Sequence, residues 1–265
     1  MEESILDKYE AVIGLEVHAQ MLTNSKAYSN DINEYGAQPN SNISVITLGH
    51  PGTLPRMNKQ TVEFAIRLGI ACEADIADAQ YFARKNYFYP DLPKGYQITQ
   101  DTTPICTGGR IIIQDEEGSE KSIHLTRIHM EEDAGKSMHD MDIYDTLVDL
   151  NRAGVPLLEI VSEPDMRSSQ EAYNYLTEVR KLVRYLDICD GNMEEGSLRC
   201  DANISVRLKG APEFGTKVEV KNMNSIRNVQ RAIEFEIRRQ IEMVENGETI
   251  SQETRSFDAP NNRTI

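Results

Sequence analysis

Three stretches of the chain alternate apolar residues with side chains of the kind that hold metal ions and phosphates. Their polar rows are Glu16 and His18; Arg199, Asp201 and Asn203; and Lys217, Glu219 and Lys221. Residues two apart on a β-strand share a face, so each stretch should direct its polar row to one face and its apolar row to a core. The pattern indicates a sheet whose open face is a reaction site for charged substrates.

A fourth cluster, residues 129–136, holds one His, three carboxylates and one Lys. Mg²⁺ and Mn²⁺ prefer carboxylate oxygen and accept an occasional imidazole, whereas structural zinc sites are usually built from Cys and His. The composition therefore favours Mg²⁺ or Mn²⁺. A charge run can also be an ordinary solvated loop, and a Glu and a His two apart can be surface decoration, so both alternatives stay open here.

Residues 84–96 interleave basic and aromatic side chains. Aromatic rings can stack on a nucleotide base while Lys and Arg hold its phosphates. The alternative is a packed loop whose rings fill the core and whose Lys residues are merely solvated. Taken alone, the segment is compatible with both interpretations.

The elements that must position these residues come as strands in hairpins and clusters, with helices between the clusters. Strands are expected near residues 9–22, 110–114, 122–130, 154–161, 198–207 and 217–221, with a strand, a turn and a returning strand over 254–265. Asn58, Ser168 and Ser225 fit helix N-caps and predict helices from there to about residues 70, 189 and 246. This order predicts one continuous α+β domain, a largely antiparallel open sheet with helices on one face.

Composition limits the class of protein. Hydrophobic residues make up 39% of the chain and charged residues 27%, and no stretch approaches the roughly 20 apolar residues that span a bilayer. The acidic start lacks the regions of a signal peptide, and the four Cys residues show no C-x-x-C spacing, so we expect a cytoplasmic protein without membrane contact. The net charge of −15 excludes a general nucleic-acid binder; any RNA contact needs a local patch, a partner or a further segment.

A set of motifs resembles those of a known family, the B subunits of the aspartyl/glutamyl-tRNA amidotransferases. The motifs are residues 16–18, 84–91, 129–136, 148–152, 159–165, 194–203 and 219–222. The resemblance runs from about residue 9 to residue 265 and implies a catalytic domain similar in fold to glutamine synthetase and the guanidino kinases. It also implies that residues 1–265 are one truncated catalytic domain, without the family's helical tRNA-binding tail.

In that family the protein uses ATP and Mg²⁺ to phosphorylate the side-chain carboxylate of Glu mischarged on tRNA(Gln) or Asp mischarged on tRNA(Asn). Ammonia released from glutamine by the glutaminase partner then displaces the phosphate, and a third, linking polypeptide joins the two. The resemblance thus implies a ligase, with the A and C subunits of the amidotransferase and mischarged tRNA as partners. We find no Ser–His or Cys–His pair placed to activate a nucleophile, so we expect no glutaminase activity in this chain.

Phosphoryl transfer to a carboxylate brings two anions together and needs metal ions and cationic side chains. For this chemistry we assign as metal ligands Glu16, His18, Glu132 and Glu219. The groups expected to bind ATP are Lys85, Asn86, Tyr87, Lys136 and Arg199. The groups expected to act in catalysis are Lys85, Asp133, Lys136, Arg199, Asp201, Asn203 and Lys221. Among them, Asp201 and Asn203 could hold a second metal ion or the α-amino group of the substrate.

One departure from the family concerns zinc. Many members carry a Cys-rich zinc site, and the corresponding positions here are Ser29, Asp31, Ser44 and Thr47, so no zinc is expected.

Two other functions stay open. One is a catalytically silent protein that docks tRNA and orients the glutaminase partner, and the other is a free-standing carboxylate–amine ligase for a small molecule. A silent relative should have lost its ligands, whereas the polar rows here are complete. ATP hydrolysis that depends on charged tRNA would separate a tRNA enzyme from a small-molecule ligase.

Overall fold

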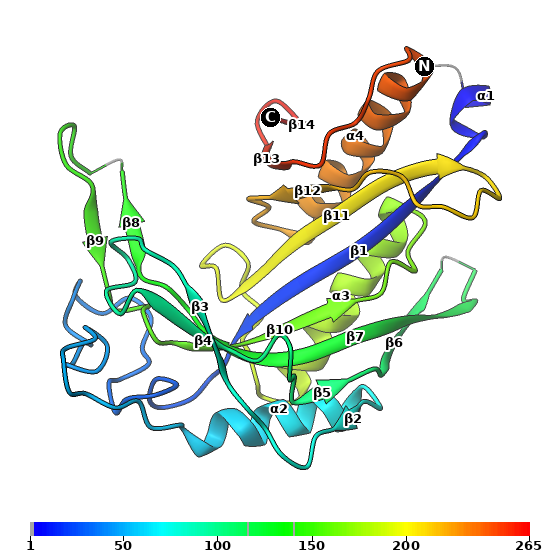
Figure 1. Ribbon diagram of the computed structural model, residues 1–265. Helices are drawn as coiled ribbons and strands as arrows, with labels where there is room; N and C mark the ends of the chain where they lie inside the picture. The colour runs from blue at the N-terminus through cyan, green and yellow to red at the C-terminus, as the bar shows by residue number, and fades with distance from the viewer. Residues whose placement is uncertain (1–2, 116, 140) are drawn as a thin grey trace.

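The computed structural model describes residues 3–115, 117–139 and 141–265; Glu116, in the turn of the expected 110–130 hairpin, lies outside these ranges. Most strands belong to one large sheet, and the long helices α2, α3 and α4 are spread along one face of it (Figure 1). The helices are α1 (Glu3–Leu6), α2 (Lys59–Ala71), α3 (Ser169–Tyr185) and α4 (Ile226–Glu245). The strands are β1 (Tyr9–Gln20), β2 (Asp75–Ile76), β3 (Ala83–Asn86), β4 (Tyr96–Thr99), β5 (Cys106–Thr107), β6 (Arg110–Gln114), β7 (Glu120–Glu132), β8 (Lys136–Met138), β9 (Leu147–Asp149), β10 (Pro156–Ser162), β11 (Leu198–Leu208), β12 (Val218–Lys221), β13 (Thr254–Asp258) and β14 (Arg263–Thr264).

The large sheet has ten strands in the order β14-β13-β12-β11-β1-β10-β7-β5-β2, with β6 also paired to β7. Its neighbouring strands are antiparallel except β12 and β13, which are parallel. Strand β1 lies at the centre, between β11 and β10, and pairs with β11 from Tyr9 to Ala19. The expectation of a largely antiparallel sheet with intervening helices is confirmed.

Helices cover one face of this sheet. Alternate residues of β1, including Leu15 and Val17, are fully buried and share one core with Leu68 of α2, Leu176 of α3 and Ile233 of α4. Burying each such side chain contributes about 1.5–3 kcal/mol, so this face supplies most of the hydrophobic stabilisation. The polar residues of β1 lie on the opposite face, away from these helices.

The helix starts expected from the sequence are confirmed. Asn58, Ser168 and Ser225 are the N-caps, and each side chain accepts a hydrogen bond from a backbone N–H of the first turn. The end of α3 was less well predicted: it comes at Tyr185, four residues before the expected end, and Asp187 just beyond it turns the chain with a φ of 53°. Capping residues therefore predicted where these helices begin better than where α3 ends.

Two hairpins, β3–β4 and β8–β9, form small sheets of their own. The sequence predicted neither, since no strand was expected within residues 83–99 or 136–149. Strand β4 contacts the end of β7, so the β3–β4 hairpin lies over the polar face of the large sheet (Figure 1). None of the described helices is long and apolar enough to cross a membrane.

Candidate functional site

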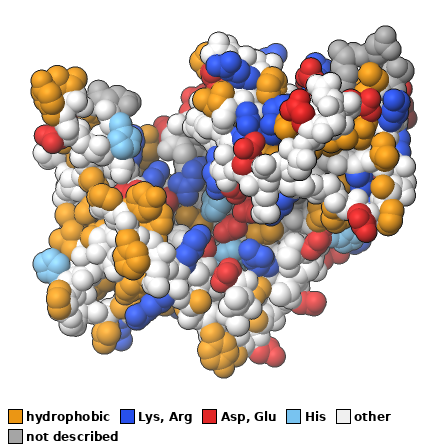
Figure 2. All heavy atoms as spheres, turned by 45° about the horizontal axis from the view of Figure 1, so that its top comes forward, with side chains coloured by type: hydrophobic (Ala, Val, Ile, Leu, Met, Phe, Trp, Pro, Cys, Tyr) orange, Lys and Arg blue, Asp and Glu red, His pale blue; other side chains and the backbone are white. Residues whose placement is uncertain are grey.

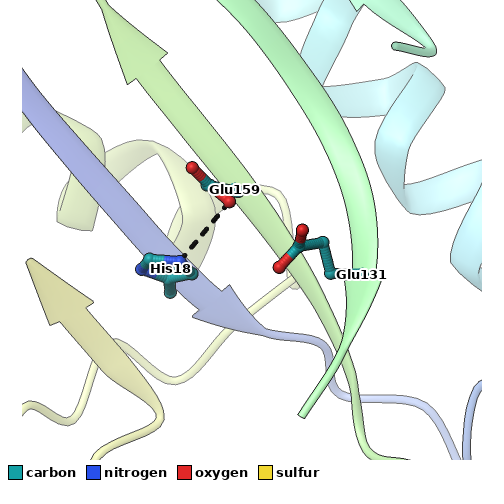
Figure 3. Close-up of side chains that lie close together, drawn as sticks. All are labelled: His18, Glu131 and Glu159. Carbon is teal, nitrogen blue, oxygen red and sulfur yellow. Dashed lines mark ion pairs between the residues drawn. The ribbon is translucent and has the colours of Figure 1, made fainter. Parts of the chain in front are cut away.

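Three adjacent strands bring a His and two Glu side chains together on the polar face. His18 of β1 is paired with Glu159 of β10, and Glu159 is paired in turn with His129 of β7, two residues before Glu131. His18 Nε2 lies 3.5 Å from Glu159 Oε2 (Figure 3). One ligand atom from each of His18, Glu131 and Glu159 lies within 4.8 Å of the other two, which is close enough to share one cation.

His129 lies behind this cluster and is fully buried. Its Nε2 atom is 3.2 Å from Glu131 Oε1 and 3.3 Å from Glu159 Oε2. Burial opposes a charge on the ring, but the two carboxylates outweigh it and raise the pKa of His129 to about 9. Burial likewise opposes ionisation of Glu159, yet hydrogen bonds with His129 and His18 hold its pKa well below the usual range.

The donors of this cluster fit a hard divalent cation. Two carboxylates and one imidazole are ligands that Mg²⁺ and Mn²⁺ accept, and Glu159 is ionised at neutral pH. The buried Nδ1 atom of His129 has no hydrogen-bond partner among the described residues. Buried polar atoms are nearly always paired, so this atom is an exception, but it is not the ring nitrogen that faces Glu131 and Glu159.

A cavity of about 270 Å³ opens above the cluster. Figure 2 shows acidic, basic and His side chains gathered in a hollow at the middle of this face. The cations on its wall, Lys85, Arg199 and Lys221, come from β3, β11 and β12. The remaining lining residues are Glu16, His18, Gln97, Glu131, Asp133, Leu157, Glu159, Asp201 and Glu219. The cavity thus holds three cationic side chains among six carboxylates.

Arg199 is oriented by Asp133. Its Nη1 atom donates a hydrogen bond of 2.8 Å to Asp133 Oδ2, which also accepts one of 2.6 Å from Gln20 Nε2. Burial opposes both charges, but Arg199 and Arg152 hold the pKa of Asp133 below its usual range, and Asp133 raises the pKa of Arg199. Arg199 therefore stays charged where it lines the cavity.

The neighbouring part of the floor is built by β1, β11 and β12. Lys221 Nζ lies 2.7 Å from Asp201 Oδ2 and 3.2 Å from Glu219 Oε1. Asn203 Nδ2 donates a hydrogen bond of 2.9 Å to Glu16 Oε1. Burial opposes the charge on Lys221, yet Asp201 and Glu219 raise its pKa, so it remains a cation. These side chains follow the alternation expected from the sequence.

The cavity brings together most of the residues assigned from the sequence. Those that line it are Glu16, His18, Lys85, Asp133, Arg199, Asp201, Glu219 and Lys221. Asn203 lies just outside and reaches the cavity through its bond to Glu16. The set of Glu16, His18, Glu132 and Glu219 does not converge on one point, because only His18 belongs to the compact cluster among the described residues.

Glu132 requires a correction. The sequence analysis assigned it as a metal ligand, which needs an accessible carboxylate, but it is 1% exposed and its carboxylate pairs with Lys94, outside the His18 cluster. Consecutive strand residues point to opposite faces, so Glu131 faces the cavity and Glu132 faces away from it. The carboxylate that β7 contributes to the cluster is Glu131.

Three other assigned residues lie away from the cavity. Lys136 is exposed on β8, where its backbone pairs with Asp149 of β9. Asn86 is exposed at the end of β3, and Tyr87 stacks on Tyr89 with ring centroids 4.6 Å apart. The structure therefore separates Lys85, which lines the cavity, from the two residues that follow it.

Sequence reasoning missed four residues of the site: Glu131, Glu159, His129 and Gln97. A signal existed for two of them. Ile128 and Met130 are apolar and buried, so strict alternation puts His129 and Glu131 on the polar face. Glu159 is a single carboxylate inside an apolar run, and such a charge is rarely buried without a partner.

A second, more apolar cavity adjoins the first. It has a volume of about 410 Å³ and shares Glu16 with the polar cavity. Its wall includes Val12, Leu15, Pro164 and Phe214, together with Gly14 and Lys217. An apolar cavity beside one lined by carboxylates and cations suits a ligand with one flat and one charged part.

Hydrogen bonds link Ser29, Asp31, Ser44 and Thr47, the positions where the resemblance placed zinc ligands in other family members. Asp31 Oδ2 accepts hydrogen bonds from Ser44 Oγ at 2.9 Å and from the Thr47 hydroxyl, and the Ser29 hydroxyl accepts one from the Asp31 backbone N–H at 3.3 Å. One carboxylate and three hydroxyls are not a donor set that zinc selects.

Known proteins resemble this chain over nearly its whole length. The model of the GatB/GatE catalytic domain matches residues 11–265. Proteins named as the B subunit of aspartyl/glutamyl-tRNA(Asn/Gln) amidotransferase from Chlorobium phaeobacteroides and Bdellovibrio bacteriovorus are 56% identical over 256 and 257 residues, and one from Thermodesulfovibrio yellowstonii is 54% identical over 257. Each match covers 97% of this chain and 53–54% of the relative, so the chain spans about half the length of these curated relatives.

Proposed function

This chain belongs to the GatB/GatE catalytic-domain family, and on that premise we propose that it carries the phosphorylating centre of a tRNA amidotransferase. The γ-phosphoryl group of ATP is transferred to the side-chain carboxylate of Glu on tRNA(Gln) or Asp on tRNA(Asn), which leaves ADP and an acyl phosphate. Ammonia then attacks the acyl carbon, and the amide forms as phosphate leaves. The names of the relatives support the class of substrate.

The arrangement of opposite charges on the sheet supports this proposal most. A carboxylate and a triphosphate repel each other, so a site that joins them must neutralise several negative charges at once. Lys85, Arg199 and Lys221 line the cavity, and the compact cluster of His18, Glu131 and Glu159 lies on its floor. A site for a neutral substrate would not need both the cationic side chains and the cluster of metal-ligand type.

The roles of the residues follow from their positions. His18, Glu131 and Glu159 are the proposed holders of Mg²⁺, which when bound supplies positive charge beside the transferring phosphoryl group. Arg199, fixed by Asp133, and Lys221, fixed by Asp201, are placed to bind phosphate oxygens without reorganisation.

The remaining parts of the proposal concern the ligands and partners. The apolar cavity of about 410 Å³ is the proposed place for the base of the nucleotide, since it adjoins the charged cavity above the His18 cluster. We further propose a fold related to glutamine synthetase and the guanidino kinases, a cytoplasmic location, and assembly with the A and C subunits of an amidotransferase. We place the main tRNA contacts in the part of the relatives that this chain does not match, because its own net charge is −15.

The test is amide formation on Glu-tRNA in a protein of the relatives' full length, with ammonium chloride, ATP and Mg²⁺ and without the glutaminase partner. We expect product with the parent, and a loss of about 10²–10³-fold in Glu159→Gln because one ligand of the cluster is gone. Glu163→Gln is the matched control: this residue follows the same strand and hydrogen-bonds Thr126 outside the cavity.

Two outcomes would contradict the proposal. Product that requires an active glutaminase partner even with ammonium present would favour a scaffold. Amide formed on a small acid as fast as on Glu-tRNA would favour a small-molecule ligase.

A further inference from the structure

The β3–β4 hairpin is attached to the large sheet by two consecutive carboxylates of β7. Glu131 accepts hydrogen bonds from Gln97 Nε2 at 3.0 Å and from Thr99 Oγ1 at 2.6 Å. Glu132 binds the same hairpin from the other side, where its Oε1 atom accepts the backbone N–H of Ile98 at 3.1 Å. Three successive residues of β4, Gln97, Ile98 and Thr99, therefore donate hydrogen bonds to these two carboxylates.

Lys94 adds an ion pair to this attachment. Its ammonium group pairs with Glu132, and the side chains of this pair are 8% and 1% exposed. The Nζ atom also lies 5.3 Å from the ring centroid of Tyr96 and 5.7 Å from that of Tyr28. A buried ion pair with these contacts is hard to break, because either charge alone would be stranded away from water.

The hairpin carries a cation into the cavity. Lys85 of β3 is paired directly with Gln97 of β4, so the two side chains lie on the same face of the hairpin. Both line the cavity above the His18 cluster. Gln97 is held by Glu131 and by the backbone oxygen of Glu132 at 2.7 Å. The position of Lys85 therefore depends on how firmly β4 is attached to β7.

We propose that the Lys94–Glu132 pair is a latch that positions Lys85 over the cavity, so that Glu132 is a positioning residue and not a metal ligand. The latch holds the hairpin from the side opposite the cavity, and it leaves Glu131 free to share its carboxylate between Gln97, Thr99 and the cluster. A role confined to overall stability would not require the pair to lie on the hairpin that delivers a cation.

The test combines hydrogen exchange with phosphate binding in this chain. Lys94→Met keeps the apolar stem between the tyrosine rings and removes the ammonium group. We expect amide protection over residues 83–99 to fall at least about tenfold, while β1, β10 and β11 keep theirs. Lys121→Met is the matched control, since it breaks the 2.8 Å pair with Glu171 far from the hairpin. If Lys94→Met does not fold, Lys94→Met/Glu132→Gln removes both charges and takes its place.

The phosphate arm rests on the proposed function and uses Mg²⁺-tripolyphosphate as the probe. We expect Lys94→Met and Lys85→Met each to weaken binding about tenfold, and the double variant to lose no more than Lys85→Met alone, because the latch acts through Lys85. Losses that add in the double variant, or unchanged protection over residues 83–99, would overturn the latch. If the parent binds no tripolyphosphate, the proposed function is overturned and hydrogen exchange alone decides the latch.

Discussion

The floor of the site has two parts that are built differently. In the part made by β1 and β11, polar side chains alternate with buried ones, and Glu16, Asp201 and Asn203 lie where a regular strand puts them. At the end of β7 and just beyond it, three consecutive carboxylates have different sets of partners. Glu131 belongs to the His18 cluster and binds the β3–β4 hairpin, Glu132 binds the hairpin from its other side, and Asp133 pairs with Arg199. In the first part, the alternation of a regular strand sets the side-chain directions. In the second part, contacts with distant segments of the chain set them.

This difference shows where the two-residue alternation of a strand reliably predicts which face a side chain occupies. Strand β1 is paired on both sides, so its backbone is regular and residues two apart share a face. Strand β7 ends at Glu132, and Asp133 lies in the chain that follows it, where it binds Gln20 and Arg199 from distant segments of the sequence. At such a junction, contacts with non-neighbouring segments decide the side-chain directions.

Removing Asp133 should have the largest effect that distinguishes the two parts. Asp133→Ala leaves Arg199 partly buried without its counter-charge, and we expect a loss of about 3–5 kcal/mol in the free energy of unfolding. Asp201→Ala breaks the pair with Lys221, which is 45% exposed, and should cost at most about 1 kcal/mol. Urea denaturation of both variants measures this, and equal losses would remove the distinction between the two parts.

A smaller effect should appear in the pH dependence of stability without metal. The folded protein holds a proton on His129 up to a pKa of about 9, against 6.5 for an ordinary His. The stabilisation is complete below pH 6.5 and is lost as pH rises to 9, by about 2–3 kcal/mol. Urea titrations in EDTA at pH 6 and pH 9 measure it. In Glu159→Gln the difference should shrink, and a flat profile in the parent would show that His129 is not charged in the fold.

Much of the fold could be predicted because its signals are local. The alternation in β1, β11 and β12 and the caps at Asn58 and Ser225 depend on neighbours within a few residues. The β3–β4 hairpin could not be predicted in this way. Its Ile98 packs with Ala27 and Tyr28, some seventy residues earlier in the chain, and its strands are only four residues long.

The residues of the site show the same contrast between local signals and long-range contacts. His18, Arg199 and Lys221 were predicted because each stands in a polar row on a regular strand. Glu159 was missed because its partners, His18 and His129, come from two other strands. The choice of Glu132 over Glu131 ignored the buried row of Ile128 and Met130, which carried the correct alternation.

The central claim is that β7 contributes Glu131 and not Glu132 to a divalent-cation site with His18 and Glu159. The most direct measurement is Mn²⁺ binding to this chain by calorimetry or electron paramagnetic resonance, in the parent and in two variants that differ by one position. We expect Glu131→Gln to weaken Mn²⁺ binding at least about tenfold, because a charged ligand is lost, and Glu132→Gln to leave it within about threefold. Loss of binding in Glu132→Gln with retention in Glu131→Gln would contradict the account.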